Sequence, residues 1–183
     1  MTLALHEQSV GATDEWYTPP EVFEALGMRF ALDVATPGPF VCPKLDPVTW
    51  IPADDWISEQ SLERDWGSGD VWMNAPFGGR NGLVPWLLKF TTHGSGVALV
   101  PDRTSAPWFQ DFAPKMDLLL FTRGKIKFID VNGNRGESPA QGTCLMAMGA
   151  RCVEALYRAD NRGLGFAAVP SRFKAVQGDQ ERG

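Results

Sequence analysis

A short stretch in the middle of the chain carries residues suited to chemistry on a planar amine. Residues 70–80 read D-V-W-M-N-A-P-F-G-G-R, so an apolar run leads directly into Asn74, Ala75, Pro76 and Phe77. Asn74 offers a carbonyl acceptor, and Pro76 fixes the backbone without donating a hydrogen bond, so neighbouring carbonyls can face outward. Phe77 supplies a flat ring. Acceptors beside a stacking ring suit a heterocycle with an exocyclic amine, although an ordinary turn after a strand has the same residues.

An acidic residue earlier in the chain is a candidate contact for a ligand. Asp33 lies near the end of the apolar segment F-A-L-D-V, and the small residues A-T-P-G-P follow it, beginning at Ala35. A strand, an acid and a small-residue loop form the pattern expected where a doubly wound sheet binds a ligand at its strand ends. A carboxylate that caps the next element has the same pattern. The loop lacks G-x-G-x-x-G, which speaks against a nucleotide-dependent oxidoreductase.

Two further pairs of residues could contact a nucleoside. Asp54 and Asp55 follow a possible strand at 48–51, at about the distance where Rossmann-type folds place a ribose-binding acid. Acids are equally favoured at the start of a helix. Asp65 and Trp66 precede the central stretch, and a carboxylate beside an indole could hold an adenine by accepting from its amine and by stacking.

Basic residues gather in the segment T-R-G-K-I-K-F. Arg123, Lys125 and Lys127 recur at every second position, so an extended chain would place three cations on one face. Phosphate contact is one interpretation, and a solvated strand face is the other. Arg103 follows another apolar run, in the segment D-R-T-S-A-P-W-F, where a charged pair at a strand end is typical of a site in an α/β sheet.

The elements that must position these residues alternate along the chain. A helix is predicted that has Pro19 and Pro20 in its first turn and stops at Gly27, and further helices are expected at 83–90, shortly after Asp102, and at 150–160. Apolar runs between turn residues predict strands at 30–34, 48–51, 70–73, 96–101, 118–121, 142–148 and 165–169. This alternation predicts an α/β fold with a mostly parallel central sheet flanked by helices.

Length and composition exclude several classes of protein. The 183 residues suit a single domain at 13–170, between a polar tail at 1–12 and a tail at 171–183 that we expect to be disordered. No apolar run approaches the roughly 20 residues of a membrane span, and the N-terminus lacks the pattern of a secretory signal, so a cytoplasmic location is expected. The three cysteines show no C-x-x-C spacing and the two histidines lie far apart, so we expect no metal.

The overall charge limits how the protein could meet nucleic acid. The formal net charge is −5 and the isoelectric point is about 5.0. A nonspecific nucleic-acid coat is therefore not expected. Local basic surface can still bind DNA through a small interface with salt-sensitive affinity.

Five motifs in order resemble one family. They are W-Y-T-P, then L-D-V-A, then D-W ahead of V-W-M-N-A-P-F-G, then V-P-D-R-T-S-A-P-W-F, then F-T-R-G-K-I-K-F. Over roughly residues 14–149 this order is similar to the phage-type, Dam-like DNA N6-adenine methyltransferases. The central stretch resembles the Asn/Asp-Pro-Pro-Tyr motif of amino methyltransferases, with Ala75 where the first Pro is usual and Phe77 where Tyr is commonest.

The resemblance implies a Rossmann-like methyltransferase fold that binds S-adenosylmethionine and acts on double-stranded DNA. It implies that Tyr17, Thr18, Pro19 and Asp33 lie near the cofactor, with the loop after Asp33 around its methionine part. It also implies that the Asn74–Phe77 motif receives the target amine. Cytosine N4, RNA or a protein glutamine are alternative targets of the same motif. A protein that binds cofactor or DNA without catalysis is a further alternative, suggested by Ala75 and the acidic charge.

Overall fold

A mixed α/β fold is seen in the computed structural model, which describes residues 16–36, 40–41, 49–50, 53–77, 82–130, 132–137, 139 and 141–171. The predicted tail at 1–12, and all but the first residue of the predicted tail at 171–183, lie outside the described residues.

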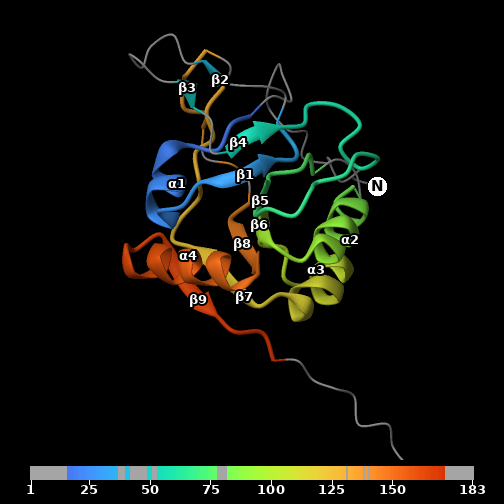
Figure 1. Ribbon diagram of the computed structural model, residues 1–183. Coiled ribbons are helices and arrows are strands. Elements are labelled where there is room, and N and C mark those ends of the chain that lie inside the picture. The colour runs from blue at the N-terminus through green and yellow to red at the C-terminus, as the bar shows by residue number, and fades with distance from the viewer. Residues whose placement is uncertain are drawn as a thin grey trace, which may run out of the picture.

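A seven-stranded sheet forms the centre of the molecule (Figure 1), in the spatial order β4-β1-β5-β6-β8-β7-β9. Its strands are β1 (Phe30–Asp33), β4 (Ala53–Trp56), β5 (Val71–Met73), β6 (Gly96–Pro101), β7 (Leu118–Thr122), β8 (Thr143–Met148) and β9 (Gly165–Ala168). The short strands β2 (Phe40–Val41) and β3 (Thr49–Trp50) pair with each other in a separate two-stranded sheet.

The expectation of a mostly parallel sheet is met only in part. β4, β1, β5 and β6 pair in parallel, whereas the pairs β6–β8, β7–β8 and β7–β9 are antiparallel. Parallel neighbours need a crossover connection, usually a helix. The chain between β7 and β8 contains no helix among its described residues, so it returns in the opposite direction.

The predicted strand at 48–51 is corrected by the structure. Thr49 and Trp50 lie in β3, outside the main sheet, and the strand that pairs with β1 is β4. β4 lies at the edge of the sheet, where only Ala53 is buried and the next three residues are exposed. An edge strand of this kind needs no apolar run, which is why the hydrophobic pattern does not reveal it.

Helices cover both faces of the sheet. α1 (Pro20–Leu26) and α4 (Ala150–Asn161) lie on one face, and α2 (Val84–His93) and α3 (Pro107–Phe112) on the other, with the 3₁₀ turn η1 (Ala113–Lys115) after α3 (Figure 1). α1 begins with proline and ends at Gly27, whose φ of 59° is left-handed and whose N–H donates to the Phe23 carbonyl. Both features match the predicted helix.

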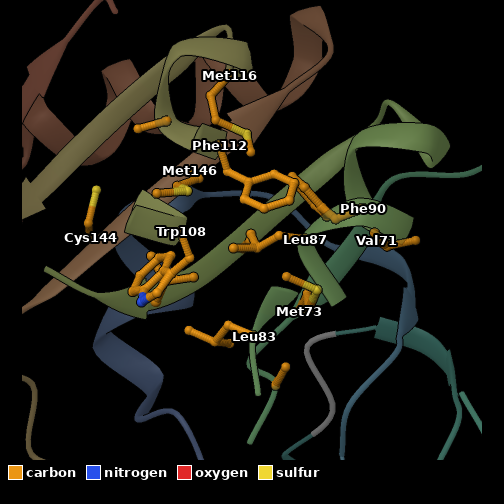
Figure 2. Packing of buried hydrophobic residues seen from close by; sticks show 14 of the residues in the cluster. Val71, Met73, Leu83, Leu87, Phe90, Trp108, Phe112, Met116, Cys144 and Met146 are labelled. Carbon is orange, nitrogen blue, oxygen red and sulfur yellow. The ribbon is translucent and has the colours of Figure 1, made fainter. Parts of the chain in front are cut away.

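Side chains alternate between the two faces along the central strands. Val71 and Met73 pack toward α2 and α3, while Trp72 packs toward α1 and α4. Figure 2 shows the cluster of buried residues between the sheet and the helices α2 and α3, which includes Met73 and Leu87 of α2. Burial on both faces explains why these strands are continuous apolar runs.

Candidate active site

Three strands deliver polar residues to the same end of the sheet. β1, β5 and β6 run in parallel, so their carboxyl ends meet, and Asp33, Asn74 and Asp102 lie there. We call this region the carboxyl end of the sheet. β1 and β5 are direct neighbours, with Asp33 opposite Trp72 and the Val34 N–H donating to the Trp72 carbonyl at 3.0 Å. The structure therefore brings Asp33 close to the Asn74 stretch, as the sequence predicts for a ligand site.

The core holds Asn74 in place from both sides. Met73 is fully buried, and Ala75 is 2% exposed with its methyl group in the cluster beneath α2 and α3. Asn74 itself is half-buried, and its Nδ2 donates to Oγ1 of Thr18 at 3.3 Å. Ala75 thus replaces the usual proline at a position whose side chain faces the core.

Pro76 and Phe77, which follow the buried Ala75, are open to solvent. Pro76 is exposed, and Phe77 is 41% exposed. Its ring can therefore be reached from solvent, three residues after Asn74. An amide and an accessible ring at one strand end can bind a planar base, the amide by accepting hydrogen bonds and the ring by stacking.

Asp33 is a buried carboxylate with an altered pKa. It is 8% exposed, and its Oδ1 accepts a hydrogen bond from the Ala35 N–H at 3.1 Å. Burial raises the pKa of Asp33 from its ordinary value of 3.8 to about 7, and the Ala35 hydrogen bond opposes this rise. Within the described part of the chain no Lys or Arg forms an ion pair with it. A cationic or hydrogen-bond-donating ligand would supply the missing partner.

The W-Y-T-P segment packs against the loop that follows the basic residues. Tyr17 and Ile129 exchange two backbone hydrogen bonds, each of 2.9 Å. A Cβ on Gly136 would lie 2.6 Å from the Trp16 ring, so only glycine permits this close approach. Glu21 at the start of α1 forms a bidentate ion pair with Arg135, and the hydrogen bond from Arg135 lowers the pKa of Glu21. These contacts fix the backbone on both sides of Thr18.

The candidate DNA contacts are all exposed. Arg103 follows β6 and donates from Nε to Oε1 of Gln141 at 2.6 Å, which joins the chain before β8 to the carboxyl end of the sheet. Arg123 follows β7, which runs in the same direction as β6 because both are antiparallel to β8. Gly124, with a φ of 75°, then turns the chain. The predicted alternation therefore applies to Lys125 and Lys127, on either side of the buried Ile126, and not to Arg123.

A protein-family model described as DNA N-6-adenine-methyltransferase (Dam) matches residues 7–159, which is most of the chain. This chain belongs to the Dam family. The match spans the Asn74 stretch, Asp33, the W-Y-T-P segment and the basic loop, so it confirms the family that the motifs resemble. Members of the Dam family are DNA adenine-N6 methyltransferases. No match was found among curated proteins or among solved structures.

The two acids expected at the ribose lie within β4, beside β1. Asp54 Oδ1 is 2.5 Å from Nε of Arg29, in an exposed ion pair. Asp55 lies opposite Leu32, and its Oδ1 accepts from the Trp56 N–H at 2.8 Å. Successive side chains of a strand point to opposite faces, so at most one of the two acids faces a given ligand. The ion pair occupies Asp54, which leaves Asp55 as the better candidate in this Dam-family chain.

Asp65 and Trp66 are not brought to the carboxyl end of the sheet. Trp66 is 4% exposed, its Nε1 donates to the Ser61 carbonyl at 3.0 Å, and its ring meets His93 at the end of α2. His93 Nε2 lies 2.8 Å from the Gly69 carbonyl, ahead of β5, so this region is at the opposite end of the strands from Asn74. Asp65 Oδ1 accepts from the Gly67 N–H at 3.0 Å. These contacts assign the pair to packing and turn formation.

Sequence reasoning missed two residues near the site. Trp56 pairs with Asp33 across β4 and β1, and its side chain is 37% exposed. The signal was an aromatic residue directly after the two acids. Gln141 binds Arg103, and nothing in its sequence context indicated this contact. In the described residues there is no group of three or more His, Cys, Asp or Glu side chains that could hold a metal ion, and none of the helices has the length and apolarity to cross a membrane.

Proposed function

We propose that this Dam-family chain moves a methyl group from S-adenosylmethionine to the N6 amine of adenine in double-stranded DNA. One observation carries the proposal: the Asn74 amide and the accessible Phe77 ring stand at the end of β5, beside the buried Asp33 carboxylate of β1. An acceptor for an amine next to a carboxylate that suits a cationic ligand is the pairing that such a transfer requires.

The residues around Asp33 fit the cofactor. S-adenosylmethionine supplies an electrophilic methyl group on a cationic sulfur. Asp33 would accept from its amino group, whose positive charge offsets the burial of the carboxylate. The loop at Ala35 and the W-Y-T-P segment (residues 16–19) would border its methionine part. Asp55, near the end of β4, would accept from the ribose hydroxyls.

The Asn74 stretch would receive the target base. A base within a duplex must leave the stack before its amine can be reached. Oδ1 of Asn74 and the carbonyl oxygen of Ala75 would accept the two amine hydrogens, and Phe77 would stack on the flipped base. The nitrogen lone pair would form the bond to the methyl carbon as the bond from that carbon to sulfur breaks with its electron pair left on sulfur, and the amine would then release a proton to solvent. Catalysis therefore depends on positioning and on hydrogen-bond electrostatics.

Exposed cations at the same end of the sheet would hold the DNA. Arg103 and Arg123 follow β6 and β7 there, and Lys125 and Lys127 lie in the next segment. Their positive charge is local, because the chain as a whole carries −5. Affinity for DNA should therefore fall steeply as the salt concentration rises, because binding releases counterions from the phosphates.

Removing two of these cations should weaken DNA binding in a salt-dependent way. We expect Arg123→Ala and Lys127→Ala each to reduce the slope of log affinity against log salt by about 1, since each phosphate contact releases roughly one counterion. Fluorescence anisotropy with labelled duplex at four salt concentrations measures this slope. Lys115→Ala is the matched control, because Lys115 is exposed but lies in η1, ahead of β7, at the opposite end of the strands. An unchanged slope in both variants would exclude these residues from the DNA interface.

The reaction itself is tested by product analysis. Purified protein is incubated with labelled S-adenosylmethionine and DNA from a strain without adenine methylation, and the digested nucleosides are read by mass spectrometry. We expect N6-methyladenine. Methylcytosine instead would keep the amine chemistry and overturn the adenine target, and the absence of any product from DNA would overturn the proposed function.

A further inference from the structure

The amide of Asn74 is bound by a hydroxyl from a distant part of the chain. Nδ2 of Asn74 donates to Oγ1 of Thr18 at 3.3 Å, across 56 residues of sequence. Thr18 is 5% exposed and Asn74 is half-buried. The hydrogen bond is therefore largely shielded from solvent, and it uses only the nitrogen end of the amide.

The backbone around Thr18 is held on both sides. Tyr17 is paired with Ile129 through two backbone hydrogen bonds. Pro19 precedes α1, where the Val22 N–H donates to the Pro19 carbonyl at 3.2 Å and the Val22 side chain is fully buried. Thr18 thus presents its hydroxyl from a fixed position rather than from a loose end.

An asparagine amide has two ends of the same shape and opposite chemistry. Its oxygen only accepts hydrogen bonds, and its nitrogen only donates them. A target amine presents hydrogens, so it needs the oxygen end. An amide turned by 180° would place donors against donors and lose the contact with the amine. Asn74 therefore works in one of two orientations that differ little in packing.

We propose that Thr18 is a positioning residue that keeps Oδ1 of Asn74 turned toward the target amine. The proposal rests on the proposed function, because the orientation matters only if Asn74 accepts from an amine. A hydroxyl can accept as well as donate, and here it accepts from Nδ2, so both ends of the amide have partners when Oδ1 binds the target amine. Thr18 acts through Asn74 in this assignment and touches none of the reacting atoms.

Two substitutions at Thr18, each in two backgrounds, separate orientation from other roles. Thr18→Val keeps the shape and removes the hydroxyl, whereas Thr18→Ser keeps the hydroxyl. The second background is Asn74→Asp, because a carboxylate presents an acceptor oxygen in either orientation. We expect Thr18→Val to lower kcat by about 10- to 100-fold when residue 74 is the native asparagine, and by less than about threefold in the Asn74→Asp background. Thr18→Ser should keep kcat within about threefold of the native value.

The controls address the fold and the cofactor. Thr91→Val removes a hydroxyl that is bonded to the Leu87 carbonyl within α2, far from the site, and should leave kcat within about twofold. The Kd for S-adenosylmethionine and the melting temperature are measured for every variant. A lost structural or cofactor contact at Thr18 would change these values and lower kcat by the same factor in both backgrounds.

Several results would overturn the assignment. It fails if Thr18→Val keeps the native kcat, or if it loses the same factor in both backgrounds. If Asn74→Asp alone has no measurable rate, Thr18→Val and Thr18→Ser in the native Asn74 background decide. A loss of kcat with valine and a native kcat with serine support the assignment, and an equal loss of kcat with both overturns it. If the native protein is active and the Thr18 variants give any of these results, only the role of Thr18 is overturned. If the native protein methylates no amine, the proposed function itself is overturned.

Discussion

Asn74→Ala is expected to lower the rate of methyl transfer to DNA by about 100- to 1,000-fold, with the affinity for S-adenosylmethionine within about threefold of native. The substitution removes the side-chain acceptor that would polarise the target amine, and preorganised groups of this kind are worth about that factor in other enzymes. Cofactor affinity should be retained because Asp33 and its loop come from β1 rather than β5. Single-turnover kinetics and calorimetry measure the two quantities.

Asn161, an asparagine remote from the site, provides the control variant. Asn161 is exposed at the end of α4, so Asn161→Ala should leave both quantities unchanged. The melting temperature is measured alongside, because the half-buried Asn74 has a hydrogen bond to Thr18 that the variant loses. More than about a tenth of native activity in Asn74→Ala would contradict the role of Asn74 as the amine acceptor.

Asp33→Asn is expected to weaken S-adenosylmethionine binding by at least about 100-fold and, at pH 8, to stabilise the protein without cofactor. Both effects have one cause: a buried carboxylate without a cationic partner costs free energy until a ligand supplies the opposite charge. Asparagine keeps an oxygen that can accept from the Ala35 N–H, and it carries no charge to bury. The gain in unfolding free energy would be about 4 kcal/mol at most, from the difference between a pKa of about 7 and the ordinary 3.8.

The stability of the native protein should depend on pH through Asp33. The folded-state pKa of Asp33 is raised, so between about pH 4 and pH 7 the folded chain binds more protons than the unfolded chain. The stability contributed by the protonated carboxyl is fully present below about pH 4 and is lost as the pH rises through about 7. Native protein should therefore lose stability over this window relative to Asp33→Asn, and its cofactor affinity should weaken as the pH falls below 7.

Denaturant unfolding at several pH values, with and without cofactor, tests both parts. Asp111→Asn serves as the control, because Asp111 is exposed in α3 and its charge needs no partner. A variant at Asp33 that binds cofactor normally would remove this residue from the cofactor site. A variant that is less stable than native protein at pH 8 would show that the carboxylate is already compensated within the fold.

Local patterns were enough to predict much of the fold. The helix α1 begins with Pro20 and stops at Gly27, and both residues are visible in the sequence. Each acts on the backbone of its immediate neighbours only, so no distant contact is needed to predict the helix. The apolar runs of β5, β6, β7 and β8 were predicted because burial on both faces demands them. An apolar run does not record direction, so the antiparallel insertion of β8 between β6 and β7 could not be predicted from it.

The candidate site divides in the same way. The sequence by itself determined which residues could accept an amine or meet a cation, because these properties belong to side chains such as Asn74 and Asp33. Only the tertiary structure decided that β1 and β5 are neighbours, that Thr18 binds the Asn74 amide, and that Trp66 is enclosed at the far end of the strands. Such contacts join residues that are distant in the chain, and they form because helices and strands must bury their apolar faces together, a condition that no short motif contains.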